Sequence, residues 1–194
     1  VITANQDDSV YGIIIQLPLT NTEKTEEICN KIAPEKDVDG LGENAKYDSA
    51  TATAINWLLS GYDVELGRSR IAIVGRGKLV GAPLLKMFTN SGYDVEMFHR
   101  GSDLNSLRDF DVIISATGVP GLINSEMVKP GAVIVDAGTA SENGVLKGDI
   151  SDEVRERHDL GGITPIMGGV GPLTIACLFE HVIMAAGEKS NSEI

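Results

Sequence analysis

Cysteine, basic side chains and long apolar runs are all scarce in this sequence of 194 residues. The two cysteines, Cys29 and Cys177, lack the spacing of a metal site or a disulfide framework, which favours a reducing, cytoplasmic environment. The 16 Lys and Arg residues stand against 28 Asp and Glu, and this net charge of −12 argues against nucleic-acid partners and anionic membranes. No apolar run approaches the roughly 20 residues of a membrane-spanning helix, and the histidines lack metal-ligand spacing. We therefore expect a cytoplasmic protein without metal, nucleic acid or membrane.

Strand and helix patterns alternate along most of the chain. Strands are predicted over Arg70–Val74, Asp94–Phe98, Val112–Ser115 and Ala132–Asp136, and helices over Thr51–Ser60, Pro83–Asn90 and Leu173–Ala186. This alternation predicts βαβ units and a parallel sheet that is covered on both faces, so the fold class is α/β. Upstream, the apolar run Tyr11–Leu19 is predicted to be a further buried strand, and Glu23–Ile32 a helix.

A glycine-rich loop follows the first of these regular strands. Residues 71–81 read IAIVGRGKLVG, with glycines at Gly75, Gly77 and Gly81. A strand that ends in closely spaced glycines and leads into a helix can place a pyrophosphate on the unpaired N–H groups of the helix N-terminus. The spacing is one residue longer than the usual dinucleotide fingerprint, and the alternative is a purely structural glycine-rich turn. We favour a dinucleotide site.

The residues after the second strand indicate which dinucleotide binds. NAD enzymes usually place Asp or Glu there to hold the ribose hydroxyls, whereas this strand runs into His99, Arg100 and Gly101. A guanidinium grips a phosphate through two hydrogen bonds, and Arg76 in the glycine loop could close on the same group. The alternative is that both arginines are merely solvated. We predict NADP as the cofactor.

Four motifs occur in an order that points to one family. They are Ile14–Leu19 (IIQLPL), Pro34–Gly40 (PEKDVDG), Val74–Pro83 (VGRGKLVGAP) and Ile163–Thr174 (ITPIMGGVGPLT). With these motifs the chain resembles the bifunctional methylenetetrahydrofolate dehydrogenase/methenyltetrahydrofolate cyclohydrolase family from Tyr11 to Ala186. The resemblance implies NADP-dependent oxidation of 5,10-methylene-tetrahydrofolate to 5,10-methenyl-tetrahydrofolate, followed by hydrolysis to 10-formyl-tetrahydrofolate.

The resemblance also implies the architecture. We expect a partial α/β folate-binding domain over residues 1–63 and a Rossmann-type NADP domain over 64–171, with a C-terminal helix over 172–194 that packs back on the folate domain. A tetrahydrofolate derivative would lie in the cleft between the two domains. Members of this family are typically homodimers through the Rossmann domain, so a homodimer is expected.

By motif match, the resemblance assigns individual residues to the substrate. Gln16 would reach the folate near the reacting centre, flanked by Ile15 and Leu17, and Asp39 would hold the N–H edge of the pterin ring. Thr139 would contact the nicotinamide end. A loop that lines both folate and nicotinamide would comprise Gly168, Gly169, Val170, Gly171 and Pro172. Two bland alternatives stay open: Gln16 could bond neighbouring backbone, and Asp37 and Asp39 could be turn residues beside Gly40.

The sequence departs from the family pattern at two places. The family carries a Tyr-x-x-x-Lys motif whose Lys serves the cyclohydrolase reaction, and no such motif occurs here, so the hydrolytic activity stays open and we expect the natural polypeptide to start upstream of Val1. Residues 49–52 read SATA, where the family usually has Pro-Cys-Thr-Pro. The alternative functions are an NADP-binding module without turnover and an NADP oxidoreductase for another small substrate, similar to shikimate dehydrogenase.

Overall fold

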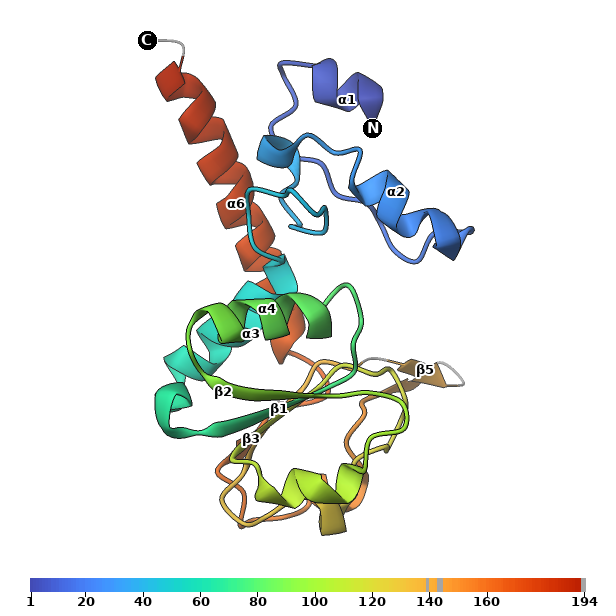
Figure 1. Ribbon diagram of the computed structural model, residues 1–194, viewed down its shortest axis with the longest axis vertical. Coiled ribbons are helices and arrows are strands. Elements are labelled where there is room, and N and C mark those ends of the chain that lie inside the picture. The colour runs from blue at the N-terminus through green and yellow to red at the C-terminus, as the bar shows by residue number, and fades with distance from the viewer. Residues whose placement is uncertain (139, 143–144, 193–194) are drawn as a thin grey trace.

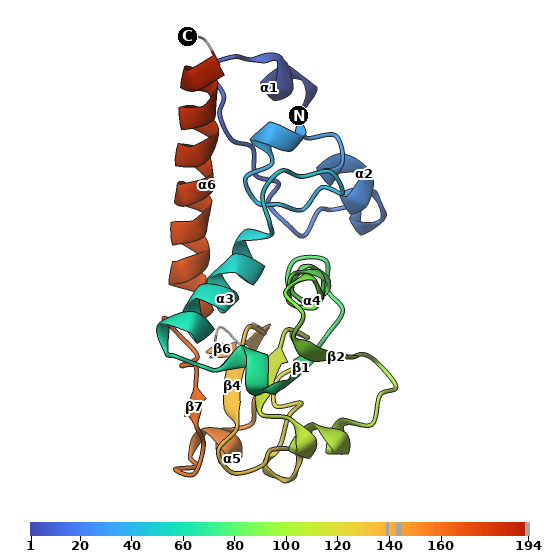
Figure 2. The ribbon, with the colours of Figure 1, turned by 60° about the vertical axis from the view of Figure 1, so that its left-hand side comes forward.

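The computed structural model describes residues 1–138, 140–142 and 145–192 of the chain. A parallel sheet with its covering helices forms one end of the molecule, and the N-terminal segments form the other (Figures 1 and 2). The long helix α6 (Val170–Ser192) runs from the sheet to the N-terminal segments, and its most extensive packing is against α3 (Ala50–Gly61). The two helices therefore connect the two ends of the molecule.

The main sheet has five strands, all parallel, in the order β2-β1-β3-β4-β7. The strands are β1 (Arg70–Val74), β2 (Asp94–Phe98), β3 (Val112–Ser115), β4 (Val133–Asp136) and β7 (Gly162–Ile163). The four predicted strands and the α/β class are confirmed. Because the strands share one direction, their carboxyl ends meet at one edge, where ligands of such sheets bind. A separate antiparallel pair, β5 (Ala140–Glu142) and β6 (Val145–Lys147), follows β4.

Short helices lie upstream of the sheet and between its strands. The α-helices are α1 (Ile2–Gln6), α2 (Thr25–Cys29), α4 (Gly81–Asn90) and α5 (Asp152–Arg155), and the 3-10 helices are η1 (Thr22–Lys24), η2 (Pro34–Lys36), η3 (Leu66–Arg68), η4 (Leu104–Asp109) and η5 (Ser125–Met127). The predicted helices at α3 and α4 are confirmed. Pro83 lies in the first turn of α4, where a missing N–H disturbs no helical hydrogen bond.

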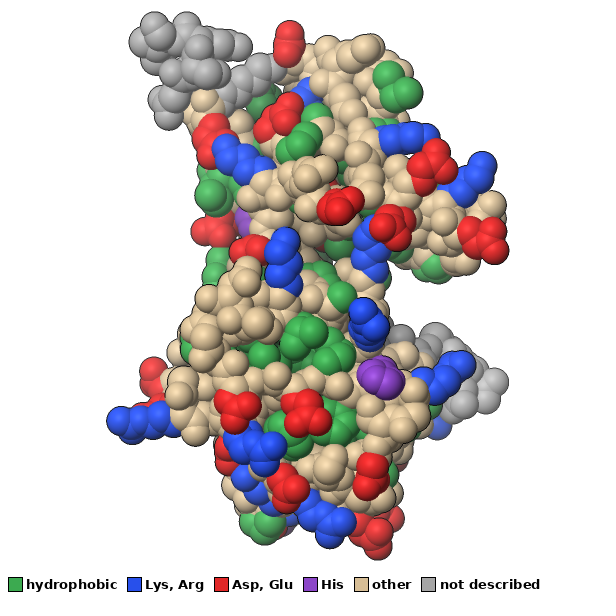
Figure 3. Space-filling model, viewed as in Figure 1, with side chains coloured by type: hydrophobic (Ala, Val, Ile, Leu, Met, Phe, Trp, Pro, Cys, Tyr) green, Lys and Arg blue, Asp and Glu red, His purple; other side chains and the backbone are tan. Residues whose placement is uncertain are grey.

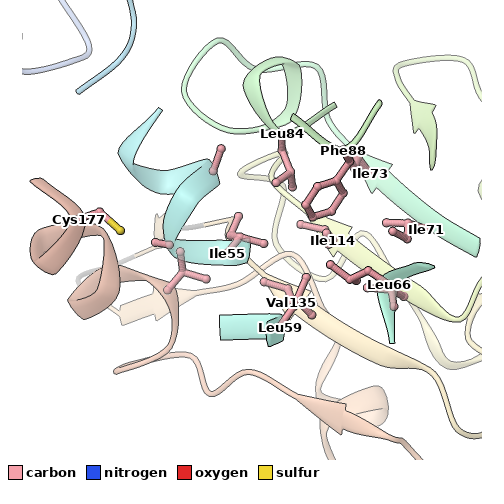
Figure 4. Packing of buried hydrophobic residues seen from close by; sticks show 14 of the residues in the cluster. Ile55, Leu59, Leu66, Ile71, Ile73, Leu84, Phe88, Ile114, Val135 and Cys177 are labelled. Carbon is pink, nitrogen blue, oxygen red and sulfur yellow. The ribbon is translucent and has the colours of Figure 1, made fainter. Parts of the chain in front are cut away.

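Apolar side chains cover both faces of the sheet. Along β1, Ile71 and Ile73 join a core with α3, α4 and α6, whereas Ala72 and Val74 face the core under η4 and α5. This alternation is the two-residue period of a strand. Figure 4 shows the first core, in which α3, α4 and α6 converge on the strands. The burial of the central strands β1, β3 and β4 accounts for their near-continuous apolar runs.

The N-terminal end differs from the prediction. Tyr11–Leu19 was expected to be a buried strand, and this is wrong: it forms one isolated parallel bridge, between Ile13 and Asp37, and Ile14 is half exposed. A run of apolar residues becomes a strand only when neighbours pair with it, and in the described part of the chain only that bridge pairs with this segment. The helix predicted over Glu23–Ile32 is limited to η1 and α2.

The C-terminal helix also differs from the prediction. It begins at Val170 rather than Leu173, and Val170–Glu188 is long and apolar enough to cross a membrane by length and composition, with a mean hydropathy of 1.5. The expectation that no apolar run approaches this length is therefore wrong. Isolated polar residues interrupt the run, but its mean hydropathy stays high enough for a membrane-spanning helix. A single such helix is weak evidence for a membrane, and this one packs on α3 through Cys177.

Cys29 and Cys177 are buried free thiols, and burial raises the pKa of Cys177 to about 11.

Candidate active site

The glycine loop lies at the carboxyl end of β1 and folds tightly on itself. The N–H of Gly75 donates to the carbonyl of Phe98 at 2.9 Å, which ties the loop to the end of β2. Gly75 has a φ of +107°, and a Cβ there would lie 2.6 Å from the carbonyl oxygen of Ala116. A Cβ on Gly81 would lie only 1.7 Å from the carbonyl oxygen of Gly75. The protein's own packing therefore requires these two glycines.

Gly77 differs from its two neighbours because the protein leaves space beside it. It is exposed, and the nearest atom to a Cβ there would be the carbonyl oxygen of Ala116 at 4.0 Å. Helix α4 begins four residues later, with no side-chain cap at Val80 and no acidic residue in its first turn. Uncapped N–H groups and the helix dipole favour an anion there. The open glycine and the free helix end together fit a dinucleotide pyrophosphate.

A cavity of about 620 Å³ extends from this loop across the ends of β1, β2 and β3. Arg76 and Arg100 both line it, both are exposed, and neither pairs with a carboxylate in the described ranges. The lining also includes the apolar side chains of Leu104, Val119 and Leu122. Two free guanidinium groups beside an apolar wall suit an aromatic base with a phosphate attached.

The structure thus brings together Gly75, Arg76, Gly77 and Arg100, which the sequence predicted to bind the cofactor. The sequence analysis missed Ser102, whose hydroxyl accepts a hydrogen bond from the N–H of His99 at 3.1 Å and thereby shapes the turn that carries Arg100. The position of Ser102, two residues after Arg100, was the only sequence feature that could have pointed to it. The predicted Thr139 lies outside the described residues.

Two aspartates in the PEKDVDG segment have different environments. Asp37 is buried, and its carboxylate accepts hydrogen bonds from the N–H groups of Gly40 at 3.1 Å and Gly42 at 2.7 Å. Asp37 is therefore a turn residue beside Gly40, which is the alternative that the sequence left open for it. Asp39 is half-buried, and its carboxylate forms no hydrogen bond with any residue that the structure describes. Asp39 is thus available to a ligand.

The pKa of Asp39 is raised, chiefly because burial penalises its charge and secondly because Asp37 lies nearby. His181 acts in the opposite direction, since its ring lies close enough to lower the pKa of Asp39. That ring stacks on Tyr47 with centroids 5.0 Å apart, and its Nδ1 lies 2.8 Å from the carbonyl oxygen of Val38. Helix α6 therefore fixes the segment that carries Asp39, and His181 is a buried, packed residue.

Gln16 and its neighbours lie on the segment beside this aspartate. The bridge between Ile13 and Asp37 aligns the two segments in parallel. Gln16 is exposed and its amide nitrogen donates to the carbonyl of Leu17 at 3.1 Å, while Ile15 and Leu17 are half-buried. This hydrogen bond agrees with the alternative that Gln16 bonds the neighbouring backbone. Neither Gln16 nor Asp39 lines the cavity that holds the arginines.

The predicted loop over residues 168–172 requires a correction. Val170, Gly171 and Pro172 belong to the first turn of α6, not to a loop, because proline and small residues are compatible with a helix N-terminus. Gly168, with a φ of +79°, and Gly169 lie before the helix. They line a separate cavity of about 390 Å³ with the end of α3 and strand β7. The cofactor loop is linked to the start of α3 by Ser49, whose hydroxyl donates to the carbonyl of Leu79 at 2.9 Å.

Two domain models of one protein family match this chain, one in its N-terminal part and one in the remainder. The tetrahydrofolate dehydrogenase/cyclohydrolase NAD(P)-binding domain matches residues 49–190, and the catalytic domain of the same name matches residues 1–39. The bifunctional protein FolD of Macrococcus caseolyticus is 40% identical in an alignment that covers 94% of this chain and 68% of that protein.

Solved structures agree with this assignment. The bifunctional FolD methylenetetrahydrofolate dehydrogenase/cyclohydrolase from Campylobacter jejuni matches with a TM-score of 0.90 and 35% identity, over 97% of this chain and 71% of that one. The methylenetetrahydrofolate dehydrogenase-cyclohydrolase from Trypanosoma brucei, complexed with NADP cofactor and inhibitor, matches with a TM-score of 0.86 and 29% identity over the same shares.

Gly77, beside open space, and Gly81, packed against backbone, should respond differently when each is replaced by alanine. Gly77→Ala should change the free energy of unfolding by less than about 0.5 kcal/mol, because its Cβ meets open space, and should weaken NADP binding at least about tenfold. Gly81→Ala should destabilise the fold by about 2 kcal/mol or more, because its Cβ meets the backbone of Gly75. Denaturant unfolding and NADP titration measure both. A Gly77→Ala protein that is unstable but binds NADP normally would contradict this assignment.

The environment of Asp39 predicts a gain in stability when its charge is removed. Because its pKa is higher in the folded than in the unfolded state, ionisation opposes folding, and the penalty grows as the pH rises between the two values. Asp39→Asn should therefore be more stable than the native protein at pH 7, with the difference vanishing below about pH 4. Asp37→Ala, the control, should lose about 3 kcal/mol because buried N–H groups lose their acceptor. A destabilised Asp39→Asn protein at pH 7 would refute this reading.

Proposed function

This chain belongs to the tetrahydrofolate dehydrogenase/cyclohydrolase family, and we propose that it oxidises 5,10-methylene-tetrahydrofolate to 5,10-methenyl-tetrahydrofolate with NADP as the hydride acceptor. The observation that carries the proposal is the pairing of two different sites in one chain. One is the cavity with a glycine loop and two arginines that pair with no carboxylate among the described residues. The other is the half-buried carboxylate of Asp39, which has no hydrogen-bond partner in the same part of the chain.

The cofactor site divides into three parts in this proposal. The glycine loop at Gly75, Gly77 and Gly81 holds the pyrophosphate close to its backbone, with the start of α4 behind it. Arg76 and Arg100 hold the 2′-phosphate, which explains why no acid follows β2. Thr139 contacts the nicotinamide end, as the family pattern implies. When bound, NADP supplies the hydride acceptor, and the chain supplies binding and orientation.

The substrate residues lie toward the N-terminal end. The Asp39 carboxylate accepts hydrogen bonds from the N–H edge of the pterin, which suits a side chain without partners of its own. Gln16 reaches the reacting carbon, with Ile15 and Leu17 against the folate. The end of the loop at Gly168 and Gly169, together with the first turn of α6 at Val170, Gly171 and Pro172, lines the approach to the nicotinamide.

The contribution of this chain to the reaction is alignment. One C–H bond of the folate methylene carbon breaks and its hydride leaves, so the folate product becomes a methenyl cation. Binding both molecules in fixed positions removes the entropy cost of their encounter, which is worth many orders of magnitude in rate. The family's second reaction adds water to that cation and gives 10-formyl-tetrahydrofolate. We assign no residue of this chain to that step.

The setting of the protein is part of the same proposal. We divide the chain into a partial folate domain (1–63), a Rossmann domain (64–171) and a returning C-terminal segment (172–194). The net charge of −12 favours a small-molecule substrate in the cytoplasm, without nucleic acid or membrane. On the face in Figure 3 acidic and basic side chains are interspersed. A homodimer through the Rossmann domain is the proposed assembly.

Formation of NADPH from 5,10-methylene-tetrahydrofolate, followed by its absorbance, tests the activity directly. We expect turnover with NADP and a much lower rate with NAD at the same concentration. NADP binding without any turnover would instead identify a binding module. Turnover with NAD alone would refute the assignment of the cofactor.

Replacing Arg100 tests the 2′-phosphate site. Arg100→Asp should weaken NADP binding by about 10- to 100-fold, the range of a lost charge-assisted hydrogen bond, and should leave NAD binding nearly unchanged. Arg108→Asp is the matched control, because Arg108 is exposed, its guanidinium donates to the nearby carbonyl of Asn105, and it does not line the cavity. Titration of both cofactors measures the effect. An equal loss for NADP and NAD would contradict the role of Arg100.

A further inference from the structure

A buried carboxylate lies beside the cofactor cavity and is used by none of the roles above. Asp149 is 1% exposed. Its Oδ2 accepts hydrogen bonds from the hydroxyl of Ser115 and from the N–H of Thr117, both at 2.7 Å. Its Oδ1 is buried and has no hydrogen-bond partner among the residues that the structure describes. Such an oxygen is costly to bury, so its presence calls for a reason.

The neighbouring carboxylate, Asp136 at the end of β4, is fully partnered. It accepts hydrogen bonds from the N–H groups of Gly138 at 3.2 Å and Asp149 at 3.0 Å. It also forms an ion pair with Arg155, whose second terminal nitrogen donates to the carbonyl of Thr164 at 3.1 Å. The positive charge of Arg155 therefore offsets Asp136. Within the described ranges no ion pair is formed by Asp149, so Arg155 is the one cation paired with either carboxylate there.

The carboxylate of Asp149 lies between the carboxyl ends of β3 and β4. Thr117, which it holds, follows β3 and lines the cofactor cavity. Gly138 follows β4, and a Cβ on it would lie 2.0 Å from the Oδ1 of Asp149. In doubly wound sheets the dinucleotide crosses the carboxyl ends of the strands at the switch in strand order. With the 2′-phosphate at the end of β2, the nicotinamide half extends over β3 and β4, above Asp149.

We propose that Asp149 makes this site select the oxidised, cationic nicotinamide over the reduced, neutral one. The inference rests on the proposed function, since it requires the site to bind NADP. The oxidised ring carries a positive charge that disappears when it accepts a hydride. A buried carboxylate is weakly screened, so it attracts only the oxidised ring. The reduced cofactor, which is the product, then binds more weakly and leaves more readily.

The native chain alone provides the first test. Dissociation constants are measured for NADP⁺, for NADPH and for adenosine 2′,5′-bisphosphate, a probe that lacks the nicotinamide half. We expect NADP⁺ to bind about tenfold more tightly than NADPH, a ratio typical of one partly screened charge. Equal affinities, or tighter binding of NADPH, would overturn the inference whether or not any variant folds.

Removing the charge without changing the shape provides the second test. Asp149→Asn keeps an oxygen for Ser115 and Thr117, and should bring the NADP⁺ to NADPH affinity ratio close to one while NADPH and the bisphosphate bind as before. A merely structural role would weaken all three ligands together. Asp94→Asn is the matched control, because Asp94 is 73% exposed at the amino end of β2 and its loss should leave the ratio unchanged.

The outcomes separate this inference from the proposed function. If none of the three ligands binds the native chain, the proposed function fails and this inference fails with it. If all three bind and the ratio in the native chain is close to one, only the role of Asp149 is wrong. An Asp149→Asn protein that keeps the native ratio leads to the same conclusion.

Discussion

The common direction of the five strands is the constraint on which the rest of this structure depends. It brings the carboxyl ends of β1, β2, β3 and β4 to one edge of the sheet. The glycine loop, the turn that carries Arg100 and the carboxylates of Asp136 and Asp149 all meet there. A parallel sheet must be covered on both faces, so the groups of the sheet that bind the cofactor lie at this edge. Fold and site therefore have one physical origin.

Two buried carboxylates next to each other at that edge behave differently because their surroundings differ. Asp136 accepts hydrogen bonds from backbone N–H groups and forms an ion pair with Arg155, so groups of the protein itself occupy its carboxylate. Asp149 keeps one oxygen without a described partner. The same contrast occurs at the other end of the molecule, where Asp37 is fully bonded in its turn and Asp39 is not. In each pair the bonded carboxylate shapes the backbone, and the other remains available to act on a ligand.

The sequence predicted the features that depend on local pattern. The strands β1 to β3 have the predicted bounds, because their apolar runs end at glycines and turn residues. Features that depend on distant partners could not be read in the same way. The run Tyr11–Leu19 has the composition of a strand but pairs only at Ile13. No local pattern gives Asp149 a role, because its partner Ser115 lies 34 residues away. The start of α6 was placed three residues late, since Gly171 and Pro172 suggested a loop.

The central claim is that the dinucleotide lies across the strand ends with its nicotinamide half over β3 and β4. Backbone amide NMR shifts of the full chain, compared between NADP⁺ and adenosine 2′,5′-bisphosphate, test it most directly. Both ligands should shift the amides around Gly77 and Arg100, and only NADP⁺ should shift that of Gly138. Identical shifts at Gly138 with the two ligands, with the differences located elsewhere, would contradict the account.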